Sequence, residues 1–276
     1  MGRLAHTDGL TEFEQDILAT VRDFTNREII PVATELEHRD EYPAQIVEGM
    51  RKLDLFGLTI PEAYGGLGAS LLIYALTVEE IARGWMSMSG INTHFIVAHM
   101  IARNGTDERK DYFLPQMAAG DVRGAFSMSE PGLGSDVAAI RTRAERDGED
   151  FVLNGQKMWL TNGGTANLVA VLCHTDDGHE APHRNMTTFL IEKEPGFGPN
   201  PKVPGLTVPG KIEKMGYKGV DTTKLVLADV RVPASRVLPV VRGSHRRRAR
   251  DQESIVLLAR PARCRRILRP RAALRA

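Results

Sequence analysis

The chain has 276 residues, of which 42% are hydrophobic and 26% are charged, and its net charge is +1; this is the ordinary composition of a globular protein of about two domains. It contains no run of ~18 apolar residues, which excludes a membrane-spanning helix, and its polar start, MGRLAHTDGL, lacks the apolar core of a secretory signal. The two cysteines, Cys173 and Cys264, form no CxxC pair, so we expect a cytoplasmic protein with no disulfide framework and no bound metal.

Residues 1–120 are predicted to form a helical domain. Thr11 and Glu14 make a T-x-x-E capping box, and apolar residues then recur at helical spacing at Phe13, Ile17, Val21 and Phe24. Pro31 is expected to interrupt this run, because a proline inside a helix removes a donor and clashes with the previous turn. Further helices are expected around Ile46, Met50 and Leu53, and over Leu71–Arg83, Ser87–Arg103 and Asp107–Ala118.

The pattern changes after Gly120, and residues 121–236 are predicted to form a β-domain. Short β-rich runs are separated by the dipeptides Asp147-Gly148 and Asn154-Gly155, which favour tight hairpins. Further strands are expected at Leu168–Cys173, Thr187–Glu192 and Lys224–Leu227. The expected fold class is therefore α+β, with an all-helical N-terminal domain followed by an antiparallel β-domain.

The first chemical motif runs from Phe126 to Asp136, with the sequence FSMSEPGLGSD. Glycines allow backbone N–H groups to approach a ligand closely, and serine hydroxyls suit a polar heterocycle or an anion. The alternative is an ordinary β-turn with serine caps, and the residues alone leave both interpretations open. Val137 stands where a dinucleotide fingerprint needs glycine. Glu130 is interpreted as a structural residue that bonds the turn.

The second motif runs from Gln156 to Gly164, with the sequence QKMWLTNGG. It is typical of a strand that ends in a loop, and Trp159 and Thr161 are two residues apart, which predicts a common strand face. A planar ring could stack near the indole and accept a hydrogen bond from the hydroxyl. The alternative is a core tryptophan at a polar strand end.

Together the two motifs are more specific. EPGxGSD, followed after about twenty residues by NGxKxWxTNGG, closely resembles the acyl-CoA dehydrogenase family. The loop from Pro61 to Gly68, the segment Glu213–Gly216 and the ending Val230–Pro233 support this resemblance, which covers about residues 10–240. The family's fold has a helical domain, a β-domain and a C-terminal four-helix bundle.

The resemblance implies an FAD-dependent enzyme that removes hydrogens from the α and β carbons of a fatty acyl-CoA. Its partners would be an acyl-CoA substrate and an electron-transfer flavoprotein that accepts the electrons, and the family assembles as homotetramers. Ser135 would contact the substrate as well as the cofactor. The cofactor-binding residues implied are Phe126, Ser127, Met128, Ser129, Gly134, Ser135, Trp159, Leu160 and Thr161.

The family pattern stops near Leu238, and residues 237–276 are predicted to be an Arg-rich tail outside it. Residues 242–276 hold 12 arginines and two acids, a run expected to be solvated and to bind no nucleic acid. The family's catalytic base comes from the bundle, so no catalytic residue is assigned within residues 1–241. Two alternatives to an active dehydrogenase are a truncated, inactive remnant and a flavin monooxygenase of the same fold.

Overall fold

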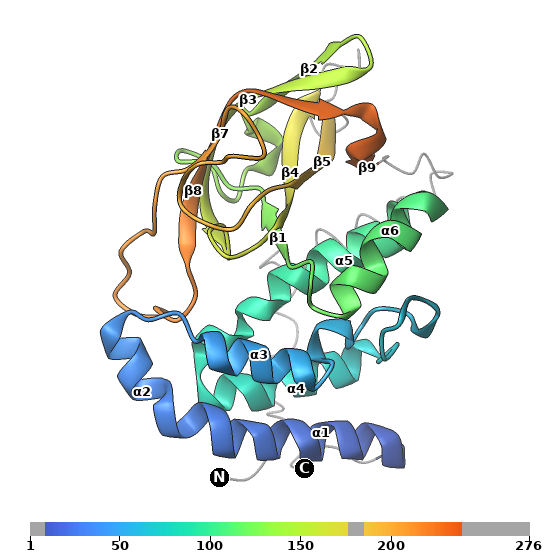
Figure 1. Ribbon diagram of the computed structural model, residues 1–276, viewed down its shortest axis with the longest axis vertical. Coiled ribbons are helices and arrows are strands. Elements are labelled where there is room, and N and C mark those ends of the chain that lie inside the picture. The colour runs from blue at the N-terminus through green and yellow to red at the C-terminus, as the bar shows by residue number, and fades with distance from the viewer. Residues whose placement is uncertain (1–8, 176–184, 239–276) are drawn as a thin grey trace, which may run out of the picture. The chain divides into compact units, whose positions relative to one another are not determined.

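The computed structural model describes residues 9–175 and 185–238, so the predictions for the tail after residue 238 lie outside the described residues. Helices occupy the first half of this region and strands the second, as predicted (Figure 1). None of the helices in these two ranges has both the length and the apolar character needed to cross a membrane.

The first helix, α1 (Glu12–Phe24), begins at the predicted capping box. The Glu14 backbone N–H donates to the Thr11 hydroxyl, and the Thr11 N–H donates to the Glu14 carboxylate. Its buried side chains are Leu18, Val21 and Phe24. Phe13 belongs to the predicted stripe but is 58% exposed, so the stripe is not buried along its whole length.

Pro31 does not end the helix. A π-helical turn, η1 (Thr25–Ile29), lies between α1 and α2 (Ile30–Arg39), and the Ile30 N–H donates to the Thr25 carbonyl five residues earlier. Pro31 has no N–H to donate, and at the start of α2 the missing donor costs little. The irregularity is where the sequence predicts it, but the chain continues as a helix.

The remaining helices follow the predicted order. The expected helix over Ser87–Arg103 is divided, since its first part is the 3-10 segment η4 (Met86–Ile91). The fifth predicted helix has the predicted ends. The bounds of the others are α3 (Ala44–Lys52), η2 (Leu55–Gly57), η3 (Glu62–Tyr64), α4 (Leu71–Gly84), α5 (Asn92–Asn104) and α6 (Asp107–Ala118).

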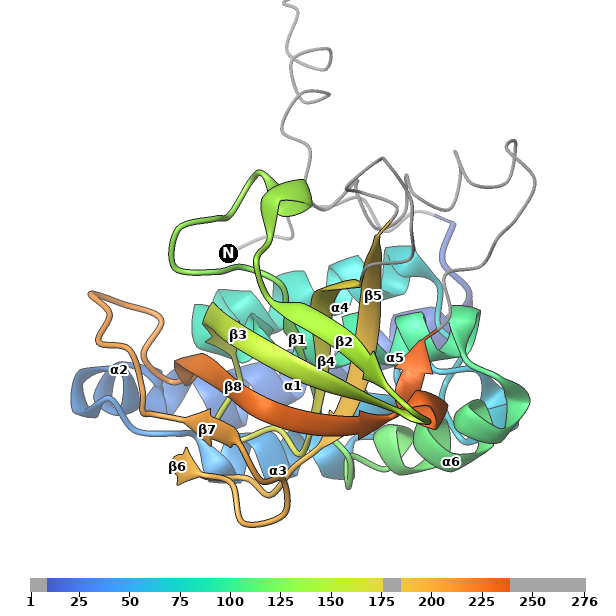
Figure 2. The same cartoon turned by 90° about the horizontal axis from the view of Figure 1, so that it is seen from above.

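The strands form one mostly antiparallel sheet in the order β6-β7-β8-β3-β2-β4-β5-β9, with β1 and β2 both parallel to β4. In Figure 2, β8, β3 and β2 lie side by side across the view. The strand bounds are β1 (Gly124–Ser127), β2 (Arg143–Asp147), β3 (Asp150–Thr161), β4 (Leu168–Thr175), β5 (Met186–Glu192), β6 (Gly198–Pro199), β7 (Leu206–Val208), β8 (Thr222–Pro233) and β9 (Val237–Leu238).

One of the two predicted hairpins is confirmed and the other is wrong. β2 and β3 form a hairpin whose two turn residues are Gly148, with φ 64°, and Glu149. Asn154-Gly155 instead lies inside β3 at a bulge opposite β8. The Asn154 side chain exchanges two hydrogen bonds with Asp229, and a Cβ on Gly155 would lie 2.7 Å from Thr142. Pairing along β8 therefore overrides the local turn preference.

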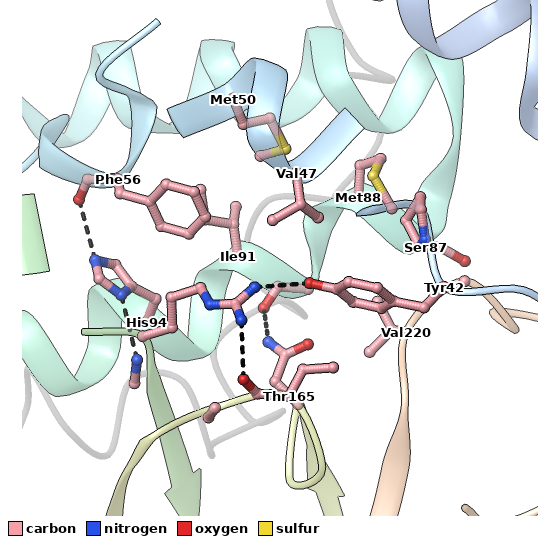
Figure 3. A pocket seen from close by; sticks show the side chains of 17 residues that line it. Tyr42, Val47, Met50, Phe56, Ser87, Met88, Ile91, His94, Thr165 and Val220 are labelled. Atoms are coloured by element: carbon pink, nitrogen blue, oxygen red, sulfur yellow. Dashed lines mark hydrogen bonds between the residues drawn. The ribbon is translucent and has the colours of Figure 1, made fainter. Parts of the chain in front are cut away.

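His94 joins the helices to the first strand. Its Nδ1 accepts the backbone N–H of Gly124 at 3.3 Å, and its Nε2 lies 3.1 Å from the Phe56 carbonyl (Figure 3). The ring must therefore be neutral, with its proton on Nε2. Complete burial lowers the pKa of His94 to about 4.

This geometry predicts acid sensitivity. The unfolded chain takes up the His94 proton near pH 6.5 and the folded chain only near pH 4, so the free energy of unfolding should fall as the pH drops across that window. His94→Gln should lose about 1–3 kcal/mol at pH 7 and show a shallower pH slope in urea titrations. Exposed His38→Gln is the control. An equal slope in wild type and His94→Gln would contradict the assignment.

Candidate functional site

The structure brings the two sequence motifs together. The Met158 backbone N–H donates to the Ser129 carbonyl at 2.9 Å, so the end of β3 runs beside the segment that follows β1. Trp159 is the next residue along β3. The hydroxyl-bearing loop and the indole therefore belong to one surface region.

The predicted site residues divide by exposure. Ser127 and Leu160 are buried, and the Ser127 hydroxyl has no hydrogen-bond partner. Phe126, Met128, Ser129 and Thr161 are half-buried, whereas Gly134 and Ser135 lie in an exposed loop. A β-turn does form within the first motif, where Glu130 and Leu133 exchange backbone hydrogen bonds.

Trp159 is not a core residue, because 55% of it is exposed. Its φ of 62° lies in the left-handed region, which is rare for a bulky side chain and costs about 1–3 kcal/mol. The register of β3 against β8 shifts between Lys157 and Leu160, so strand alternation is broken at this bulge. The predicted pairing of Trp159 and Thr161 on one face by simple alternation therefore does not apply.

A buried ion pair lies beneath this surface. Lys157 Nζ is 3.0 Å from Glu130 Oε1, and their side chains are 0% and 6% exposed. The same oxygen accepts the Thr142 N–H and hydroxyl at 2.8 and 2.6 Å, and Glu130 Oε2 accepts the Arg141 N–H at 2.8 Å. Lys157 also donates to the Met128 carbonyl at 3.1 Å. Glu130 is thus structural, as the sequence predicts.

The electrostatics of the pair follow from these contacts. Burial alone would raise the pKa of Glu130, but the hydrogen bonds from Thr142, Arg141 and Lys157 outweigh it and lower that pKa. Burial lowers the pKa of Lys157, and the Glu130 charge offsets part of that effect. A carboxylate that accepts four hydrogen bonds has little capacity left for proton abstraction.

Two cavities lie away from this surface. One, of about 50 Å³, lies between the helices and the loop after β3, where Arg123 donates to the Tyr42 hydroxyl and the Thr165 carbonyl (Figure 3). A groove of about 450 Å³ is lined by Glu37, Trp85 and others. Neither is lined by Trp159 or Ser129. Within the described ranges, no three His, Cys, Asp or Glu side chains gather as metal ligands.

Asp221 is a site residue that the sequence reasoning missed. Its buried side chain holds the turn that follows β3, 57 positions away from Gly164 along the sequence. The sequence feature that points to such a contact is the Gly163-Gly164 pair. It indicates that another group approaches the backbone closely, but it does not identify Asp221 as that group.

The ion pair gives a stability prediction. Glu130→Gln should lower the free energy of unfolding by about 3–5 kcal/mol, because it leaves the Lys157 charge buried and unpaired. Urea denaturation of the full chain measures this. Glu145→Gln, on exposed β2, is the matched control and should stay within about 0.5 kcal/mol. In the double variant Glu130→Gln with Lys157→Met, part of the loss should be recovered; strictly additive losses would argue against coupling of the pair.

Comparison with known proteins supports the assignment made from the motifs. Residues 11–121 match the family model described as acyl-CoA dehydrogenase, N-terminal domain, and residues 125–230 match acyl-CoA dehydrogenase, middle domain. The mitochondrial long-chain specific acyl-CoA dehydrogenase of Mus musculus is 39% identical over 227 residues, which are 82% of this chain and 51% of that protein. The chain thus spans about half the length of the curated relatives it matches.

Solved structures agree. The acyl-CoA dehydrogenase from Geobacillus kaustophilus superposes with a TM-score of 0.77 at 33% identity, over 85% of this chain and 60% of that one. A glutaryl-CoA dehydrogenase from Mycobacterium smegmatis in complex with FADH2 superposes with a TM-score of 0.74 at 33% identity, over 85% and 57% of the two chains. With both of its structural parts matched in sequence and in fold, the chain belongs to the acyl-CoA dehydrogenase family.

Proposed function

We propose that the surface around Ser129 and Trp159 binds FAD, and that the chain supplies this flavin-binding face for the α,β-dehydrogenation of a fatty acyl-CoA thioester. The observation that carries the proposal is Trp159, a large apolar side chain held 55% exposed in a strained backbone conformation beside a loop rich in serine and glycine. Strain of this kind persists where surrounding structure enforces it, and it gathers at ligand sites.

The residues present fit such a cofactor. The buried Ser127 hydroxyl has no partner, and a Cβ built on Gly132 or Gly134 would meet nothing within 4 Å. The loop therefore leaves open space in which its N–H groups and hydroxyls can meet a polar ligand. The residues proposed to hold FAD are Phe126, Ser127, Met128, Ser129, Gly134, Ser135, Trp159, Leu160 and Thr161, with Ser135 also meeting the substrate.

Each group has a role that follows from its chemistry. The exposed indole offers a flat apolar face for a planar ring, and Thr161 can donate a hydrogen bond to a ring heteroatom. The exposed Ser135 can donate to an anionic or carbonyl oxygen of the substrate. FAD, when bound, supplies a hydride acceptor, and we propose an electron-transfer flavoprotein as the partner that takes the electrons onward.

The proton-abstracting base is proposed to lie outside the described residues. A base needs a carboxylate near the α-carbon proton of the substrate. The buried carboxylates of residues 9–175 and 185–238 are already engaged: Glu130 with Lys157, Glu80 with Arg22 and Arg83, and Asp221 with the turn after β3. These three therefore contribute to the scaffold, and none of them is free to act as the base.

Flavin binding can be tested directly. The purified chain should bind FAD and turn yellow, and Trp159→Ala should weaken binding about tenfold, because a stacked aromatic partner is worth about 0.5–1.5 kcal/mol beyond the area it buries. Fluorescence titration with FAD measures the affinity. Tyr112→Ala removes a comparably exposed aromatic from α6 and should bind like wild type. Equal affinity for all three proteins would place the ring elsewhere, and no binding by wild type would refute the proposal.

Catalysis gives a separate prediction. The 276-residue chain loaded with FAD should reduce a dye acceptor negligibly with short, medium or long acyl-CoA, because Glu130, Glu80 and Asp221 are engaged in the scaffold and a missing general base typically costs about 10²–10⁴-fold in rate. Steady-state assays across the three chain lengths measure this, with buffer containing free FAD as the blank. Turnover within the common enzyme range of about 1–10³ s⁻¹ would show that a base is present in the chain.

A further inference from the structure

One buried carboxylate holds the turn that follows the proposed flavin-contacting strand end. Asp221 is 5% exposed and lies immediately before β8. Its Oδ2 accepts the backbone N–H groups of Gly164 at 2.6 Å and Thr165 at 2.9 Å. Its own carbonyl accepts the Asn162 N–H at 2.8 Å. Three N–H groups of one turn therefore converge on a single residue that immediately precedes another strand.

The two glycines of the turn are explained by this approach. A Cβ on Gly164 would lie 2.5 Å from Asp221 Oδ2, and a Cβ on Gly163 would overlap the Thr223 hydroxyl. Side chains at these positions would push the turn away from β8. The glycines of the motif therefore allow close packing on Asp221 and Thr223, so no ligand is needed to account for them.

The strand end in the second motif has a left-handed residue on both of its sides. Trp159 and Asn162 both have left-handed backbones, with φ of 62° and 61°, and they flank Leu160 and Thr161. Asparagine adopts this conformation comparatively often, whereas a bulky residue such as Trp159 adopts it only when neighbouring contacts enforce it. On the N-terminal side, the Met158–Ser129 hydrogen bond and the buried Lys157 fix the backbone. On the C-terminal side, Asp221 fixes it.

Two further contacts hold the turn that Asp221 binds. The Asn162 side chain donates to the Gly90 carbonyl at 2.8 Å and to the Thr93 hydroxyl at 2.9 Å, which ties the same turn to the helices. Thr161 pairs in register with Thr222, the residue after Asp221. A shift of Asp221 would therefore be transmitted to Thr161 through the ladder and to Trp159 through two peptide units.

We infer that Asp221 is a positioning residue for the segment Trp159–Thr161, acting through the turn and not by contact with the flavin. The inference rests on the proposed function for its effect on FAD, but its effect on the strand end is independent of any ligand. A neutral group at this position would weaken hydrogen bonds that are strong because the acceptor is charged. The strand end would then sample conformations in which the indole is misaligned.

The test compares the full chain with Asp221→Asn, which keeps the side-chain shape, and with Glu213→Gln, which removes an exposed carboxylate from the preceding loop. Two quantities are measured at low temperature on folded protein: the FAD dissociation constant, and the amide and indole N–H signals in ¹H–¹⁵N NMR spectra. Gly164→Ala is a second variant that tests the same contact, because its Cβ would displace the Asp221 carboxylate without removing the charge.

We expect Asp221→Asn to bind FAD about tenfold or more weakly and to shift the Gly164, Thr165 and Trp159 signals, with Glu213→Gln unchanged. Gly164→Ala should give the same pattern. If wild type binds no FAD but Asp221→Asn still shifts the Trp159 signals, the positioning role stands and the proposed function falls. Unchanged Trp159 signals, or unchanged FAD affinity in an Asp221→Asn protein whose wild type binds, would overturn the inference.

Discussion

The ion pair between Glu130 and Lys157 is the constraint on which the rest of this structure depends. Removing two charges from water is costly, and only nearly complete hydrogen bonding offsets that cost. Glu130 meets this requirement with donors from Thr142, Arg141 and Lys157, and Lys157 adds the Met128 carbonyl. These contacts fix three separate segments, namely the loop after β1, the entry to β2 and the middle of β3, at one point in the β-domain.

The exposed face around Trp159 begins directly after Lys157 of this ion pair. Lys157 reaches inward to Glu130, and directly after it the chain passes through a bulge at which Trp159 has a left-handed backbone and faces solvent. Asp221 then fixes the far end of the same segment. A scaffold that stabilises a strained, solvent-facing indole at both ends is suited to holding a planar ligand in one orientation, which is the property that hydride transfer to a flavin needs.

Local patterns predicted the fold where local forces decide it. The capping box at Thr11 and the helix over Asp107–Ala118 follow from spacing and end residues, and both are confirmed. The hairpin expected at Asn154-Gly155 is wrong because β3 pairs with β8 along its length and turns the dipeptide into a bulge. The exposure of Trp159 could not be predicted, since the bulge at which it lies arises in the pairing of β3 with β8, a strand distant in the sequence.

The family resemblance named the candidate site residues from their motifs, but their arrangement was not predictable. Sequence placed Ser129 and Trp159 in separate segments, and the structure joins these segments through the Met158–Ser129 backbone hydrogen bond and the contacts of Lys157. Amide hydrogen exchange with and without FAD tests the central claim most directly. The account predicts that FAD slows exchange in residues 127–135 and 158–162 and leaves the groove beside Trp85 unchanged. Slowing confined to that groove, or to no part of the β-domain, would contradict it.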